Sequence, residues 1–335
     1  MEPFTASSAA LPPLAVVIPS FSRPDTLQRV LGALAEQADE AAAVLIGLDG
    51  SARVTPTPRI PSPLADRTRV LRFERCGSIA LRQRLLDAAR TPVLLWLNDD
   101  AEPRPGLLQG HRAIHTEHPR AIGIGRQDWA APQDLFDRMV QQTDLLFFQR
   151  PPDRPPNFRD CYGLNLSFRR EEAIASGGLP DHPEPYGYDD LALAWDLIRT
   201  GCRPIDLPES RVLHHHRYGP AEVHRREYRL GRSAFHWARL RPGFAVDLFG
   251  RELTAADFLD DAAAAQRLGR RDACRIEAGF LAWAESPVDA VPAVVLPRLA
   301  EHWLPLKRWL WRQGVLDAAA GVADRWGLLR EGAWP

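Results

Sequence analysis

The stretch LLWLNDDAEPRPG, residues 94–106, runs from four apolar residues directly into an amide and two carboxylates. This pattern predicts a buried strand that ends where Asn98, Asp99 and Asp100 begin. Carboxylates are costly to gather at the edge of a core unless a cation joins them. A solvated turn after the strand is the plainer interpretation of the same residues. What precedes and follows the stretch decides between a turn and a binding site.

The composition limits the possible classes of protein. The chain has 335 residues, 45% of them hydrophobic, which suits one large domain or one domain with an appendage. The net charge of −1 creates no overall field that would attract nucleic acid, so we expect no nucleic-acid partner. Four scattered cysteines without a C-x-x-C pair argue against a thiolate zinc site and favour a reducing compartment. Without a secretory signal or a long apolar run, we expect a cytoplasmic protein.

Strand and helix patterns alternate through the first hundred residues. Alternation of this kind predicts an α/β fold with a mostly parallel central sheet flanked by helices. Asp25 or Thr26 is the expected cap of the first helix. The expected strands are 14–20, 42–51, 69–75 and 92–100, the expected helices are 25–38 and 78–90, and residues 52–66 are expected to form a loop.

Polar clusters at 20–23, 49–51 and 98–100 follow three of these strands. Ligands of parallel sheets bind beyond the carboxyl ends of the strands, so we expect the clusters to meet in one crevice. The sequence lacks the glycine-rich dinucleotide fingerprint, the P-loop pattern and the G-x-S-x-G elbow. Carboxylates without a glycine cradle suggest a diphosphate bound through a divalent cation.

The second half of the chain contains an ordered set of motifs. Their order and spacing resemble the central region of family 2 glycosyltransferases, which have the GT-A fold. The motifs are Gly163–Asn165–Ser167, Gly177–Gly178, the acid pair Asp189–Asp190, Gly201, Pro208 and His214.

The first half resembles the same family over VVIPSFSRPDTL, LDGS, CGSIALRQ and NDDAEP, so the resemblance covers about residues 14–216. The chain departs from the family pattern at several positions, which leaves the donor nucleotide and its sugar open. These are Asp189 in place of glutamate, Asn98 as the first residue of the Asp-x-Asp motif, Ser22 and Gln83 in place of asparagines, and Asp196 in place of a frequent arginine.

The resemblance implies a metal-dependent enzyme that moves a sugar from a nucleoside-diphosphate sugar to an acceptor hydroxyl, with inversion. It implies Mn²⁺ or Mg²⁺ as cofactor and a role in bacterial-type polysaccharide or glycoconjugate synthesis. The acceptor is expected to be a sugar, a lipid-linked molecule or a small molecule. Three regions are expected: a flexible N-terminus at 1–13, the GT-A domain at 14–220 and a helical C-terminal region at 221–335.

The resemblance also suggests roles for individual residues. Asp190 would be the catalytic base, with Asp189 beside it, although acidic residues also favour helix N-termini without catalysing anything. Asp100 and His214 would bind the metal, and His215 and His216 compete with His214 for that role. The residues expected to bind the donor are Pro19, Phe21, Arg23, Asp49, Arg82 and Asp99.

Some residues have two open interpretations. Arg82 would contact the base or the phosphates, or would be an ordinary helix-surface arginine. Tyr186 and Tyr188, and more weakly Trp129, would stack on an acceptor sugar, or would simply pack the loop. Arg232 would reach the diphosphate, or would lie on a solvated helix.

The C-terminal region is rich in tryptophan, with Trp303, Trp309, Trp311, Trp326 and Trp334. Tryptophan next to basic residues is typical of an interfacial membrane helix, so peripheral contact with the inner face of the membrane is one expectation. Packing of a helical appendage against its domain is the commoner reason for such a pattern.

Two other functions compete with transfer. A non-catalytic sugar-nucleotide-binding scaffold would keep the same crevice. A sugar-1-phosphate nucleotidyltransferase would share the sheet, but it would carry a glycine-rich loop after the first strand, where this chain has PSFSRPDTL. The sequence leaves open the donor, the acceptor, the linkage and the oligomeric state.

Overall fold

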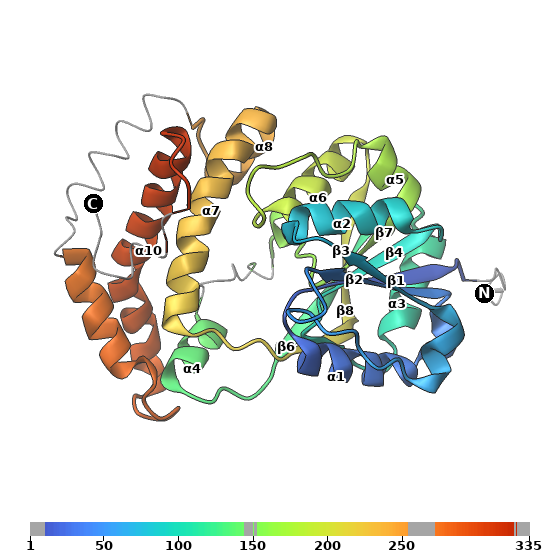
Figure 1. Ribbon diagram of the computed structural model, residues 1–335, viewed down its shortest axis with the longest axis horizontal. Helices are drawn as coiled ribbons and strands as arrows, with labels where there is room; N and C mark the ends of the chain where they lie inside the picture. The colour runs from blue at the N-terminus through green and yellow to red at the C-terminus, as the bar shows by residue number, and fades with distance from the viewer. Residues whose placement is uncertain (1–10, 144–149, 151–152, 254–271, 325, 327–335) are drawn as a thin grey trace, which may run out of the picture.

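The computed structural model describes residues 11–143, 150, 153–253, 272–324 and 326. The chain forms an α/β part built on one curled sheet, and a group of helices that stands beside it (Figure 1). The fold class predicted from the sequence is therefore confirmed.

Eight strands form the sheet in the order β3-β2-β1-β4-β7-β6-β8-β5. The first four strands run parallel, as their apolar, β-branched sequences predict. The second half is mixed, because β7 is antiparallel to both β4 and β6, and β5 is antiparallel to β8. The strands are β1 Leu14–Ser20, β2 Ala43–Asp49, β3 Thr68–Phe73, β4 Val93–Leu97, β5 Ala101–Pro103, β6 Ala121–Trp129, β7 Asn165–Arg169 and β8 Arg203–His214.

Helices cover both faces of the sheet and bury two apolar clusters against it. On one face, α2 and α6 pack on β4 and β7 around Trp96 and Phe168, whose rings meet edge to face at 5.0 Å. On the other face, α1 and α3 cover β1 and β4. The helices of this part are α1 Pro24–Ala35, α2 Gly77–Ala88, α3 Leu107–Glu117, α5 Arg170–Ala175 and α6 Asp189–Arg199.

The helical part has its own apolar cluster, centred on Trp303. Helix α4, which comes from the first half of the chain, packs into this cluster, so the two parts are joined by more than one connection (Figure 1). Its elements are α4 Leu135–Gln142, α7 Pro220–Leu240, α8 Pro242–Phe249, a helix over 272–284 and α10 Leu296–Ala319.

Two glycines allow α7 and α10 to approach closely. A Cβ on Gly231 would lie 1.8 Å from the carbonyl oxygen of Trp311, and a Cβ on Gly314 would lie 1.9 Å from that of Tyr228. Real Cβ atoms do not approach carbonyl oxygens so closely. The absence of both side chains therefore sets the separation of the two helix axes.

Several expectations about local structure need correction. Helix α1 is not capped by Asp25 or Thr26: its N-cap is Arg23, and Pro24 occupies the first turn, where a missing N–H costs nothing. The expected loop over 52–66 contains the start of a 3-10 helix, Ser62–Arg67.

The tryptophans of the C-terminal region that the structure describes mainly pack the helices. Trp303, Trp309 and Trp326 are 0–6% exposed and belong to the helical cluster. Among the described residues, no helix combines the length and the apolar character needed to cross a membrane. Trp334, most of the expected N-terminal segment 1–13 and residues 254–271 of the expected helical C-terminal region lie outside the described residues.

Candidate functional site

A cavity of about 1260 Å³ lies between the carboxyl ends of the strands and helices α6, α7 and α10. The three polar clusters that were expected to meet do so here. A parallel sheet produces this arrangement, because its strands all deliver their following residues to the same edge. The cavity is lined at the sheet edge by Pro19, Ser20, Phe21, Arg23, Asp49, Asn98, Asp99, Asp100 and His214.

Asp100 lies at the centre of the sheet-edge cluster. Its carboxylate is 1% exposed and accepts a hydrogen bond of 2.5 Å from Arg23 Nη1. His216 Nδ1 lies 3.1 Å from Oδ2, and His214 Nε2 lies 3.4 Å from Oδ1. Burial alone would raise the pKa of Asp100, but the interactions with both histidines and with Arg23 hold that pKa well below its usual range. The carboxylate is therefore charged at neutral pH.

Asp99 has a different environment. It accepts a hydrogen bond of 2.7 Å from Ser20 Oγ and lies 3.5 Å from Arg23 Nη1. Burial and the neighbouring charge of Asp100 raise the pKa of Asp99 to about 6. Arg23 thus holds together two carboxylates that would otherwise repel each other.

His215 points to another partner, which separates it from its neighbours. Its Nε2 lies 2.7 Å from Glu102 Oε2, on the short strand β5. Alternation along the chain explains the difference, because successive side chains of an extended segment face opposite ways. His214 and His216 therefore share the Asp100 side, while His215 faces away from it.

Asp49 links β2 to the start of α2. It accepts hydrogen bonds from the backbone amides of Cys76 at 2.7 Å and Gly77 at 3.0 Å, and from Arg75 Nη1 at 2.9 Å. The guanidinium of Arg75 also lies over the ring of Phe21, 3.3 Å from its centroid. Asp49 lines the cavity as predicted, but its carboxylate already serves as an anchor for a helix N-terminus.

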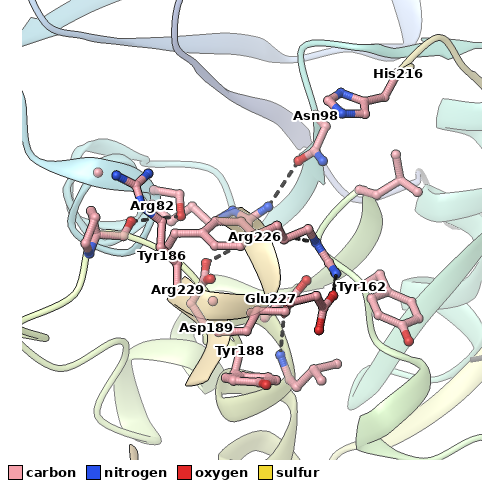
Figure 2. Close-up of a pocket in the computed structure, with 18 of the residues that line it drawn as sticks. Arg82, Asn98, Tyr162, Tyr186, Tyr188, Asp189, His216, Arg226, Glu227 and Arg229 are labelled. Carbon is pink, nitrogen blue, oxygen red and sulfur yellow. Dashed lines mark hydrogen bonds and ion pairs between the residues drawn. The ribbon is translucent and has the colours of Figure 1, made fainter. Parts of the chain in front are cut away.

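Arg82 is buried, so the interpretation as a helix-surface arginine is wrong. Its Nη1 donates to Asp189 Oδ2 at 2.6 Å, and its Nη2 donates to Asn98 Oδ1 at 3.1 Å. Figure 2 shows Arg82 and Asp189 at the wall of the cavity. The pair joins α2 to the N-terminus of α6 across 107 residues of sequence.

Asp190 is held by backbone amides. Its Oδ2 accepts from Gly163 N at 2.8 Å, and its Oδ1 accepts from Leu191 N at 2.9 Å. Burial, and then the charge of Asp189, raise the pKa of Asp190 above its usual range. Asp190 lines the cavity, so its carboxylate is placed to accept a proton from a molecule bound there.

Tyr188 precedes the acid pair in a left-handed conformation, with φ 64°. Such a conformation costs about 1–3 kcal/mol in a residue other than glycine, and it persists only where the surroundings impose it. Helix α10 restrains the side chain of this residue, because Trp311 Nε1 donates to the Tyr188 hydroxyl at 3.1 Å. The ring of Tyr188 also packs edge to face against Phe249 at 5.4 Å. These contacts favour a packing role for Tyr188.

Tyr186 is more accessible, with 38% of its surface exposed, and it lines the cavity. Its hydroxyl accepts a hydrogen bond of 3.3 Å from Arg226 Nε, on α7 (Figure 2). The backbone between these tyrosines is tied to the same helix, because Gly187 O accepts from Ser233 Oγ and Trp237 Nε1.

Two other candidates lie elsewhere. Trp129 packs on the ring of His214, with 4.8 Å between centroids, and is not among the described residues that line the cavity. Arg232, considered for the diphosphate, instead pairs with Glu184 at 2.8 Å. That pair holds the segment before the acid pair onto α7.

The structure adds lining residues that the sequence did not identify. They come from α7 and α10 and include Arg225, Arg226, Arg229, Lys307, Arg308 and Arg312. The sequence offers two signals for them: six arginines against two glutamates over residues 221–243, and Lys307, the only lysine of the chain.

The groups around Asp100 form part of a metal ligand set. Asp100 Oδ1 is buried and has no aligned hydrogen-bond donor among the described residues, although His214 Nε2 lies nearby. A carboxylate oxygen and an imidazole nitrogen are a donor set that Mn²⁺ accepts. Within the part of the chain that the structure describes, no three His, Cys, Asp or Glu side chains are grouped so that they could hold a metal by themselves. These residues therefore fit a cation whose remaining ligands come from a bound molecule.

Comparison with known proteins supports the resemblance. Residues 15–174 match the family model described as glycosyl transferase family 2. The mannosyltransferase PcManGT of Pyrobaculum calidifontis, solved with GDP-Man and Mn²⁺, is similar in structure with a TM-score of 0.55 and 16% identity, covering 95% of this chain and 90% of that one. TarS of S. aureus, residues 1–349, solved with UDP-GlcNAc, gives a TM-score of 0.45 and 14% identity, covering 93% of each chain. No curated protein sequence matches the chain.

The family match extends from β1 into α5, so it includes the ends of β1, β2 and β4 that line the cavity, while His214 and the acid pair lie beyond it. It confirms the resemblance to family 2 glycosyltransferases and the predicted class of enzyme, a glycosyltransferase. The likeness to PcManGT supports the GT-A fold.

Proposed function

We propose that this glycosyltransferase moves a sugar from a nucleoside-diphosphate sugar to an acceptor hydroxyl, with inversion and with the help of a divalent cation. One observation carries the proposal. A single cavity joins the Asp100–His214 cluster at the strand ends to Asp190 at the start of α6. Transfer needs these two kinds of group in one space: one set to hold a diphosphate, and a base to accept a proton.

The reaction assigns a separate task to each side of the cavity. On the α6 side, Asp190 accepts the proton of the acceptor hydroxyl as its oxygen bonds to the anomeric carbon. The bond between that carbon and the diphosphate oxygen breaks, and the electron pair leaves with the diphosphate. Attack opposite to the leaving group inverts the anomeric centre.

On the strand side, Asp100 and His214 would hold the cation. A divalent cation there, Mn²⁺ or Mg²⁺, would neutralise the charge that develops on the leaving diphosphate. Arg23 bridges Asp99 and Asp100 in the protein as described, so it fixes both carboxylates before a donor arrives. Phe21 and Arg75, stacked at the same edge, offer a surface for the nucleotide base.

Release of nucleoside diphosphate from a donor panel tests the proposal. GDP-mannose and UDP-N-acetylglucosamine are the first donors to try, because the proteins compared above were solved with them. An enzyme releases nucleoside diphosphate when Mn²⁺ or Mg²⁺ is added, even if only by slow hydrolysis. A scaffold would bind a donor without releasing it. A role in polysaccharide or glycoconjugate synthesis remains part of this proposal, and the acceptor that supports transfer would test it.

A further inference from the structure

The wall that α7 and α10 contribute to the cavity is strongly basic. The lining residues that come before α7 in the sequence include five arginines and five aspartates, so the charges of these side chains balance. The wall carries six cations against two carboxylates, Glu222 and Glu227. We call this set of six the basic wall: Arg225, Arg226 and Arg229 from α7, and Lys307, Arg308 and Arg312 from α10.

The excess of positive charge is local. The whole chain has a net charge of −1, so the basic wall does not reflect an average composition. Internal pairs remove some of this excess: Arg226 bonds Glu227 at 2.7 Å, and Arg229 bonds Asp324 at 2.9 Å. Arg225 and Arg308 are exposed, one on each helix.

Lys307 strengthens the case. Its ammonium group is largely buried, and burial lowers its pKa. Lys307 is the single lysine of the chain, and it lies in this wall. All the remaining residues in the count of lysine and arginine are arginine. Lys307 lines the cavity beside the arginines of the same wall, so an anion bound there would meet its charge together with theirs.

The position of the basic wall identifies the substrate that it would meet. The segment before Asp190 contacts both helices, through Arg226 on Tyr186 and through Trp311 on Tyr188. An acceptor whose hydroxyl reaches Asp190 must therefore lie against α7 and α10. The strand ends, where the metal and the donor are proposed to bind, form the other side of the cavity. Ligand pockets usually enclose about 300–1,000 Å³, so this cavity has room for more than a donor alone.

We propose that the acceptor carries a phosphate group close to the hydroxyl that attacks, and that the basic wall binds this phosphate. The inference rests on the proposed transferase function and adds a substrate class to it. Guanidinium groups match the oxygens of phosphate in paired hydrogen bonds, and lysine adds a compact charge. The phosphate belongs either to a water-soluble phosphate ester or to the head of a lipid-linked acceptor.

Calorimetric titration of the full chain tests the inference. Mn²⁺ and the nucleoside diphosphate of the active donor are kept saturating, so that the donor site is filled. Glucose 6-phosphate and glycerol 3-phosphate are then compared with glucose and glycerol. We expect the phosphate esters to bind and the neutral compounds not to bind, and we expect binding to weaken as salt is added. Equal binding of esters and neutral compounds, or no binding of either ester, overturns the inference.

A vesicle experiment identifies the source of the phosphate. Phosphatidylcholine vesicles with and without phosphatidic acid are sedimented with the protein under the same conditions. If the protein sediments with the vesicles only when they contain phosphatidic acid, the phosphate belongs to a lipid-linked acceptor. If the protein binds the soluble esters but does not sediment with these vesicles, the phosphate belongs to a water-soluble acceptor.

Matched variants then locate the binding. The double variant Arg225→Gln/Arg308→Gln removes one exposed cation from each helix of the basic wall, and we expect affinity for glucose 6-phosphate to fall about tenfold. The control Arg239→Gln/Arg298→Gln removes the same charge from exposed positions of the same helices that do not line the cavity. Equal losses in both double variants would mean that only overall charge matters, which overturns the inference.

Donor affinity separates this inference from the proposed function. The donor is titrated with Mn²⁺ in the absence of any phosphate ester. Failure to bind any donor contradicts the transferase proposal. Normal donor binding without a preference for phosphate esters contradicts the inference alone.

Discussion

Arg82 Nη1 and Asp189 Oδ2 form a buried ion pair at 2.6 Å, directly beside the carboxylate of Asp190. The pair gives two adjacent aspartates different surroundings. Asp189 is balanced by a guanidinium, whereas Asp190 accepts hydrogen bonds from the backbone amides of Gly163 and Leu191. The difference makes their roles separable by mutation.

Asp190→Asn should retain donor and metal binding and lose turnover by about 10²–10⁴-fold, because the amide cannot accept a proton. The side chain keeps its shape but only one acceptor oxygen, so one of the hydrogen bonds from Gly163 N and Leu191 N is lost and the unfolding free energy should fall by about 1–3 kcal/mol. Single-turnover transfer at saturating donor and metal measures the loss. Near-normal transfer would exclude Asp190 as the base.

Asp189→Asn serves as the matched control. It leaves the buried charge of Arg82 without its counterion, and breaking a buried pair costs about 3–5 kcal/mol of unfolding free energy. Its main effect should therefore appear in a thermal melt, with less loss of turnover than in Asp190→Asn. If Asp189→Asn is the inactive variant of the two, the base is one residue earlier than proposed.

The pH dependence of transfer should reflect the raised pKa of Asp190. Burial and the charge of Asp189 favour the protonated form, which cannot act as a base. Turnover should therefore fall as the pH drops through a value above the usual aspartate pKa of about 3.9. Single-turnover rates between acidic and neutral pH test this. A rate that stays constant down to about pH 4 contradicts the assignment.

Asp100→Asn should weaken metal-dependent donor binding by about 100-fold, since even partners of metal ligands are worth about 10–100-fold. The amide keeps the size of the side chain at a site that is only 1% exposed. Calorimetric titration of the donor with Mn²⁺ measures the effect. Glu102→Gln is the control, because Glu102 pairs with His215 and not with Asp100. Unchanged donor affinity in Asp100→Asn would remove Asp100 from the metal site.

The three consecutive histidines should differ in their effect on metal activation. His214→Ala should raise the Mn²⁺ concentration needed for half-maximal activity by about tenfold. The resemblance favours His214 over both neighbours, but the structure brings His216 as well as His214 to Asp100. We therefore expect a measurable effect for His216→Ala and the smallest for His215→Ala. A larger effect at His215 than at His214 would contradict this metal site.

Gly314→Ala should destabilise the protein by about 1–3 kcal/mol, because the added methyl group would push the backbones of α10 and α7 apart. Chemical denaturation measures the change. Gly32→Ala is the matched control in α1, where a Cβ meets no atom within 4 Å, and alanine favours a helix. Equal stability of the two variants would mean that the helices separate without strain.

The sequence predicted those parts of the fold that depend on short-range patterns. Strand β1 was predicted with the bounds observed, and the presence of Asp49 and Asp100 in one cavity followed from the rule for strand ends. The Arg82–Asp189 pair could not be predicted, because 107 residues separate its members and neither of their motifs indicates that the two side chains contact each other. The basic wall was missed for a related reason. Its arginines are spaced like those of any solvated helix, and only the packing of α7 on α10 shows which of them face the cavity.

The bond between Tyr188 and Trp311 has a consequence for the order in which the enzyme is made. Tyr188, in its left-handed conformation next to the acid pair, bonds to a partner 123 residues later in the chain. Synthesis proceeds from the N-terminal end, so the sheet and α6 leave the ribosome before α10 does. The residue before α6 then lacks its bond to Trp311 until α10 emerges. A nascent chain would thus hold the residues of the strand-end cluster before Tyr188 gains its hydrogen-bond partner on α10.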